Sequence, residues 1–99
     1  MQIILRKRQM GKTTELIRIS AETFAYLVVP TKNDASRVSQ MAKEIGLDIP
    51  FPLSYDEFIR GQYHGKNIKG FLIDNADMLL QYMSKGVAIK AISLNDDAT

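Results

Sequence analysis

Apolar residues are distributed along the chain in two patterns, as short apolar runs and as longer stretches with helical spacing. Runs rich in β-branched and aromatic residues predict strands at residues 2–5, 23–30, 71–73 and 87–94. Between these runs, apolar residues recur every three or four positions, which is the spacing of one face of a helix. The alternation predicts an α/β fold, in which a small parallel β-sheet carries helices on both faces.

The stretch 31–48 has the clearest helical periodicity. Asn33 or Asp34 is expected to cap the start of this helix, and Gly46 lies where a helix commonly ends. Four apolar residues, spaced i, i+3, i+4 and i+7, are expected on the buried face of the helix: Val38, Met41, Ala42 and Ile45.

Two shorter helices are predicted in the second half of the chain. Ser54, followed three residues later by Glu57, is a capping-box pattern that opens a helix ending at Gly61. Another helix follows the strand at 71–73. Its apolar residues are expected to belong to the core: Met78, Leu79 and Leu80.

The composition is typical of a globular protein, and residues 1–99 are expected to form one domain. Cysteine is absent and His64 is the single histidine, so disulfides, thiolate chemistry and a structural zinc site are all disfavoured. We expect His64 to be solvated in a polar loop. No apolar run approaches the roughly 18 residues of a membrane helix or the h-region of a signal peptide. These features predict a cytoplasmic protein without a membrane partner.

The net charge is only +2, but basic residues are concentrated near the N-terminus. Within residues 1–20, a single acid, Glu15, stands against five basic residues: Arg6, Lys7, Arg8, Lys12 and Arg18. The asymmetry indicates either an anion-binding site or a solvated basic turn.

The segment around Gly11 has the order of elements that a phosphate-binding loop requires. An apolar run precedes a loop, and Gly11, Lys12 and Thr13 then open a helix whose N-terminus would face the phosphates. The lysine would reach the terminal phosphates, Thr13 would bind Mg²⁺, and Thr14 could meet the α-phosphate. The full pattern G-x-x-x-x-G-K-[ST] is broken, because Arg6 stands where the first glycine belongs.

A second element of such a site follows the apolar strand 71–73. Asp74 comes directly after this strand, where a carboxylate can hold the water shell of Mg²⁺. The alternative is an aspartate that only caps the following helix.

At this point the chain resembles a P-loop NTPase of the RecA-like branch that includes helicases and phage terminase ATPases. The segment "RQMGKTT", residues 8–14, is similar to the terminase form of Walker A, and "FLIDNADML", residues 71–79, is similar to a Walker B strand. The segments "AYLVVPTKNDASRVSQ" and "SYDEFIRG" resemble the layout of superfamily-one helicases.

The resemblance implies a minimal RecA-like core that binds ATP, or another nucleoside triphosphate, with Mg²⁺. It further implies a phage or mobile-element protein that acts in DNA metabolism or packaging, and it puts Ser93 or Asn95 near a sensor position. The metal would be held by Thr13 and Asp74. The implied nucleotide-binding residues are Arg8, Gln9, Met10, Gly11, Lys12, Thr13 and Thr14.

The residue after Asp74 departs from the family pattern. Helicases and terminases usually carry a glutamate there, which polarises the attacking water, whereas this chain has Asn75. Asparagine can orient a water but cannot accept its proton as a general base. Asp77 could substitute only if the local turn places it correctly. The implied catalytic residues are therefore Asn75 and Arg8, with Arg8 contacting the γ-phosphate.

Three functional hypotheses remain open from the sequence. The first is an ATPase that works on DNA with partners supplying the missing parts. The second is a nucleotide-gated adaptor or inhibitor with little or no hydrolysis, which Asn75 favours over the first. The third is a degenerate fold whose basic cluster, Arg6 to Arg8, contacts nucleic-acid phosphates. The intact Gly11-Lys12-Thr13 and Asp74 argue against the third hypothesis.

Overall fold

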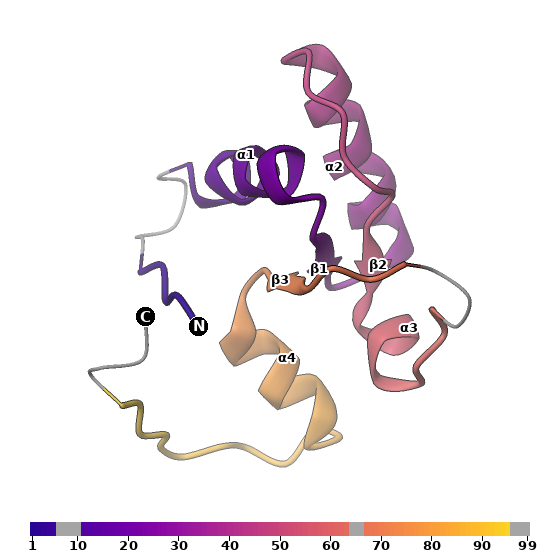
Figure 1. Ribbon diagram of the computed structural model, residues 1–99. Helices are drawn as coiled ribbons and strands as arrows, with labels where there is room; N and C mark the ends of the chain where they lie inside the picture. Colours follow the sequence, from indigo (N-terminus) through magenta and orange to yellow (C-terminus); the bar gives the residue numbers. More distant parts are fainter. Residues whose placement is uncertain (6–10, 64–66, 96–99) are drawn as a thin grey trace.

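The computed structural model describes residues 1–5, 11–63 and 67–95, which include a three-stranded parallel β-sheet (Figure 1). The strands are β1 (Tyr26–Val29), β2 (Leu53–Ser54) and β3 (Phe71–Ile73). Their spatial order is β2-β1-β3, so β1 is the central strand. In the register, Val28 stands opposite Leu53 on one side and Ile73 on the other.

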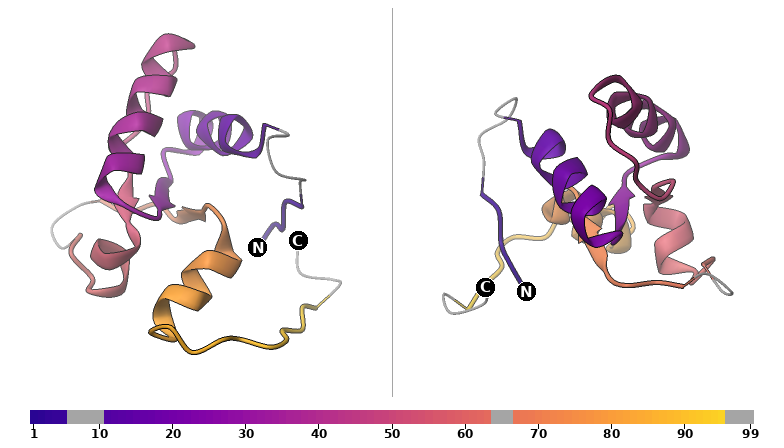
Figure 2. Two further views of the ribbon diagram at one scale, coloured as in Figure 1. Left: turned by 180° about the vertical axis from the view of Figure 1, so that it is seen from behind. Right: turned by 45° about the horizontal axis from the view of Figure 1, so that its top comes forward.

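Helices cover both faces of this sheet, as the sequence predicts. They are α1 (Lys12–Thr23), α2 (Lys32–Glu44), α3 (Tyr55–Ile59) and α4 (Ala76–Met83). Helices α1 and α2 lie on one face, and α3 and α4 lie on the other (Figures 1 and 2). The coarse prediction of a small α/β domain with a parallel sheet is therefore confirmed.

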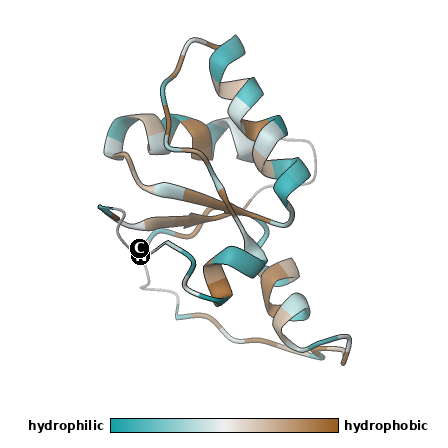
Figure 3. Cartoon of the chain, turned by 90° about the vertical axis from the view of Figure 1, so that its right-hand side faces the viewer, coloured by the Kyte–Doolittle hydropathy of each residue, from teal (hydrophilic) through white to brown (hydrophobic). Residues whose placement is uncertain are grey.

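The core is divided by the central strand into two apolar layers. Leu27 and Val29 point towards α1 and α2, while Val28, between them in sequence, packs with Leu53, Tyr55 and Leu79 on the other side. This alternation follows from the two-residue period of a strand. All three β1 side chains are fully buried. Figure 3 shows the resulting apolar sheet between its helical layers.

Two predicted strands are absent from the sheet. Residues 2–5 and 87–94 form no strand, and within the described residues β3 is paired only with β1. Several of their apolar side chains are exposed, including Leu5 at 78% and Val87 at 71%. The prediction failed because β-propensity reports only that a segment fits a pleated surface. A strand also needs a hydrogen-bonded neighbour, and composition does not reveal one.

Helix α2 confirms the predicted periodicity but corrects its two ends. Thr31, not Asn33 or Asp34, is the N-cap, because its side chain accepts a hydrogen bond from the backbone N–H of Asp34 at 3.1 Å. Val38 and Ala42 are buried and Met41 is partly buried. Ile45 is 49% exposed, because the helix has already ended at Glu44. Gly46 adopts a left-handed φ of 79° just beyond, as expected.

The capping box at Ser54 is confirmed. Its hydroxyl accepts from the Glu57 N–H at 3.2 Å, and the Glu57 carboxylate accepts from the Ser54 N–H at 2.9 Å. In α4, by contrast, only Leu79 is buried, and Met78 and Leu80 are 47% and 39% exposed. Within the described ranges, no helix is long and apolar enough to cross a membrane.

Candidate functional site

A crevice opens at the carboxyl ends of β1 and β3. Strand β1 leads into α2 on one face of the sheet, and β3 leads into α4 on the opposite face. In open α/β sheets, ligands bind where neighbouring connections diverge in this way. Here the space measures about 640 Å³ and is called the switch-point crevice below. The polar side chains that line it come from α1, α2 with its N-cap, and the end of β3: Thr13, Thr31, Asp34, Arg37, Asp74 and Asn75.

The start of α1 faces this crevice. Gly11 adopts a left-handed φ of 78° and has no side chain to cap the helix, whose N-terminus is the kind of site that binds anions. The hydroxyl of Thr13 donates to Oδ2 of Asp74 at 3.4 Å, and the ammonium of Lys12 donates to Oδ1 of Asn75. Two segments that are distant in sequence therefore meet at the crevice.

Asp74 is a buried carboxylate that is only partly satisfied. It is 6% exposed, and its Oδ1 has no hydrogen-bond partner in the described part of the chain. Burial raises the pKa of Asp74 above its ordinary value, although the charge of Lys12 and the hydrogen bond from Thr13 act in the opposite direction. A buried oxygen without a partner is energetically costly, and a bound cation would satisfy it.

Tyr55, from α3, holds the backbone that carries Asp74 and Asn75. Its hydroxyl lies 2.6 Å from the carbonyl oxygen of Asp74 and 2.9 Å from that of Asn75, so one proton is shared between two acceptors. Burial, followed by the charge of Asp74, raises the pKa of Tyr55 and keeps the hydroxyl protonated. The contact supports the left-handed conformation of Asn75, whose φ is 57°. Sequence reasoning missed Tyr55.

The donor set suits a cation that arrives with phosphates. The described residues contain no cluster of three His, Cys, Asp or Glu side chains that could hold a metal alone. Mg²⁺ commonly uses one or two carboxylates together with substrate phosphates and retained waters. Asp74 Oδ1 and the Thr13 hydroxyl fit this arrangement, so the residues expected to hold Mg²⁺ lie together.

Arg37 also lines the crevice and was not anticipated from the sequence. It projects from α2 and forms an ion pair with Asp34, one turn earlier. Asp34 is itself held by the Thr31 hydroxyl, which donates to its Oδ2 at 2.8 Å. In the sequence, Asp34 and Arg37 look like an ordinary i,i+3 pair on a solvated helix face.

The remaining predicted residues are placed as follows. Thr14 lies in the first turn of α1, half-buried, and is not among the residues that line the crevice. Asp77 and Asn95 are exposed and do not line it, and the same holds for Ser93. Five residues of the predicted loop and the histidine lie outside the described residues: Arg6, Lys7, Arg8, Gln9, Met10 and His64.

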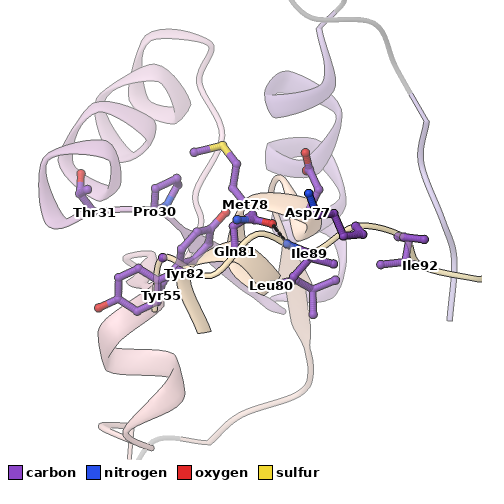
Figure 4. Close-up of a pocket in the computed structure, with 13 residues that line it drawn as sticks. Pro30, Thr31, Tyr55, Asp77, Met78, Leu80, Gln81, Tyr82, Ile89 and Ile92 are labelled. Atoms are coloured by element: carbon purple, nitrogen blue, oxygen red, sulfur yellow. Dashed lines mark hydrogen bonds between the residues drawn. The ribbon is translucent and has the colours of Figure 1, made fainter. Parts of the chain in front are cut away.

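A second, more apolar cavity of about 770 Å³ adjoins the crevice and shares Pro30, Thr31 and Met78 with it (Figure 4). Its walls include Leu80 and Tyr82, which explains why apolar side chains of α4 remain exposed. The segment after α4 closes one side, anchored where the Ile89 N–H donates to the Gln81 side chain at 2.8 Å. Asp77 belongs to this cavity.

Comparison with known proteins yields no relative from which a function could be transferred. The chain matches no protein-family model, no curated protein and no solved structure. Any assignment of function therefore rests on the residues of the switch-point crevice and on the motifs that bring them together.

Proposed function

We propose that the chain is a minimal P-loop protein that binds ATP, or another nucleoside triphosphate, together with Mg²⁺ in the switch-point crevice. The observation that carries this proposal is the pair of contacts from Lys12 and Thr13 to Asn75 and Asp74, beside a carboxylate oxygen that has no partner in the described structure. The start of a helix, a lysine, a hydroxyl and a carboxylate thus lie side by side, as a phosphate-binding site requires.

Each residue has a defined task in this proposal. The first-turn N–H groups of α1 and the Lys12 ammonium bind the phosphates, and Lys12 must release Asn75 to do so. Thr13 and Asp74 hold the cation, which supplies charge neutralisation between the phosphate groups. Gly11 is favoured by its left-handed backbone and not by crowding, because a Cβ there would meet no described atom within 4 Å.

Hydrolysis is proposed to be weak or dependent on a partner. Asn75 follows Asp74, where the resembled family carries its glutamate, and asparagine can orient a water but cannot take its proton. A protein partner would supply the missing base. By resemblance, Arg8 would contact the γ-phosphate, and the protein would act in DNA metabolism or packaging in the cytoplasm of its host, as a phage or mobile-element product.

A second function is favoured by the contact between Lys12 and Asn75. If nucleotide binding breaks this contact without turnover, the chain would act as a nucleotide-gated adaptor or inhibitor of a DNA-processing protein. The two alternatives share one binding site and differ only in hydrolysis.

The test is nucleotide affinity in the wild-type chain, in Lys12→Ala and in Lys43→Ala, which removes an equal charge from the exposed end of α2. Loss of binding in Lys12→Ala alone supports the proposal. Equal affinity in all three proteins contradicts it. No nucleotide binding, with affinity for DNA instead, would favour the degenerate fold that binds nucleic acid through Arg6 to Arg8.

A further inference from the structure

We propose that Arg37 recognises the terminal phosphate and makes the crevice select a nucleoside triphosphate over a diphosphate. This inference rests on the proposed function and specifies its substrate class. Among the described residues that line the crevice, Arg37 is the one cationic side chain, whereas Lys12 does not line it and contacts Asn75, which does. The two cations come from different helices, α2 and α1, on the same face of the sheet.

Arg37 lies within electrostatic reach of the expected metal position. Although burial is the main influence on the pKa of Asp74 and raises it, the guanidinium of Arg37 has a lowering effect on the same group. The charge of Asp34 acts in the raising direction. Both charges of the ion pair therefore lie close enough to act on Asp74, and a phosphate beside Asp74 would lie within the same range.

Arg37 is paired with Asp34 and can exchange this partner for a phosphate. The Arg37 side chain is 69% exposed, so it is not locked by packing, whereas Asp34 is 23% exposed and is fixed by Thr31. An exposed pair of this kind contributes little to stability. Arg37 can therefore exchange the carboxylate for phosphate oxygens at a small cost in free energy. The planar guanidinium offers several donors in a fork that matches phosphate geometry.

Charge balance explains why the third phosphate should matter most. Two carboxylates, Asp34 and Asp74, line the crevice together with Arg37, and Lys12 contacts Asn75 beside Asp74. A triphosphate brings more negative charge than a diphosphate, and each added group needs a donor. Lys12 and the start of α1 supply donors from one helix, and Arg37 adds a second cation from α2 for the terminal phosphate, which a diphosphate lacks.

The experiment measures the affinity of the full chain for a non-hydrolysable ATP analogue and for ADP, both with Mg²⁺. The variants are Arg37→Ala, Arg37→Lys and Asp34→Asn. The matched control is Arg60→Ala, which breaks an exposed i,i+4 pair with Asp56 that does not line the crevice. Circular dichroism confirms that each variant is folded.

We expect Arg37→Ala to lose about tenfold or more in affinity for the ATP analogue, with ADP affinity changed less than about twofold. Arg37→Lys keeps the positive charge but lacks the planar guanidinium. Its affinity for the ATP analogue should therefore lie between those of the wild-type chain and Arg37→Ala. Asp34→Asn frees Arg37 and removes a negative charge, so it should bind the ATP analogue several-fold more tightly. The gain should be larger for the ATP analogue than for ADP, because loss of the Asp34 charge alone would favour both nucleotides.

Two results would overturn the inference while leaving the proposed function in place: equal loss for both nucleotides in Arg37→Ala, or unchanged affinity for both. The inference would also be contradicted if Asp34→Asn bound the ATP analogue no more tightly than the wild-type chain does. A wild-type chain that binds neither nucleotide would instead overturn the proposed function, and this inference with it.

Discussion

The hydroxyl of Thr13 donates a hydrogen bond to Oδ2 of Asp74 across 3.4 Å, although 61 positions separate the two residues in the chain. Thr13 is in the first turn of α1 and Asp74 follows β3 directly. The contact joins the segment that resembles Walker A to the segment that resembles Walker B. It leaves Oδ1 of Asp74 as the oxygen available to a cation.

Thr13→Val should therefore weaken the Mg²⁺-dependent part of nucleotide affinity. Valine keeps the shape but lacks the hydroxyl, so we expect a loss of about tenfold with Mg²⁺ and little change in its absence. Thr13→Ser is the control, because serine retains the hydroxyl and should bind nearly as well as the wild-type chain. Equal losses in both variants would mean that packing, not metal coordination, is the role of this residue.

Asp74→Asn should stabilise the fold while it removes Mg²⁺ binding. Since burial raises the pKa of Asp74, the folded state binds a proton more tightly than the unfolded state does. The charged form therefore destabilises the fold at neutral pH, and this penalty is lost as the pH falls through the raised pKa.

Urea unfolding tests this expectation. We expect Asp74→Asn to be more stable than the wild-type chain by about 0.5–2 kcal/mol at pH 7, with the difference shrinking as the pH is lowered. A variant that is less stable than the wild-type chain at pH 7 would show that the charge of Asp74 is already well compensated without a cation.

Tyr55→Phe should destabilise the fold and loosen the site. The change leaves two carbonyl oxygens, those of Asp74 and Asn75, without their shared donor. We expect a loss of about 1–3 kcal/mol in the free energy of unfolding, together with weaker nucleotide binding.

The matched control for that change is Tyr82→Phe. The Tyr82 hydroxyl lies 3.3 Å from the exposed carboxylate of Asp56, so its removal should cost little. If both variants lose the same free energy of unfolding, the hydrogen bonds of Tyr55 stabilise the fold no more than the exposed contact of Tyr82 does.

Asn75→Glu should raise any basal hydrolysis of ATP. Glutamate supplies the carboxylate that asparagine lacks and can accept the proton of an attacking water. The gain should disappear in the double variant Lys12→Ala/Asn75→Glu, which retains the base but lacks the phosphate-binding lysine. Steady-state phosphate release measures both. An unchanged rate in Asn75→Glu would mean that this chain alone does not assemble the water site.

The sequence predicts those parts of the fold that depend on local information. The helical period locates α2, the Ser54–Glu57 capping box locates α3, and β3 is found at Phe71–Ile73 with Asp74 at its carboxyl end. Each signal lies within a few neighbouring residues, and tertiary packing did not override it.

Other features depend on contacts between distant segments and could not be predicted. Residues 87–94 have the composition of a strand, yet no partner strand pairs with them in the described structure. The partners of Tyr55 are 19 and 20 positions away, and only the packing of α3 under β3 brings them together. Arg37 lines the crevice because α2 begins where β1 ends. No sequence motif predicts this placement.

The central claim is tested most directly by titration calorimetry of the wild-type chain with ATP, once with Mg²⁺ and once with a chelator. Saturable binding that strengthens with Mg²⁺ is the predicted result, because Asp74 and Thr13 would then act on the phosphates through the cation. Absence of binding heat in both titrations of a folded protein would contradict the account, because it would mean that the crevice does not bind ATP.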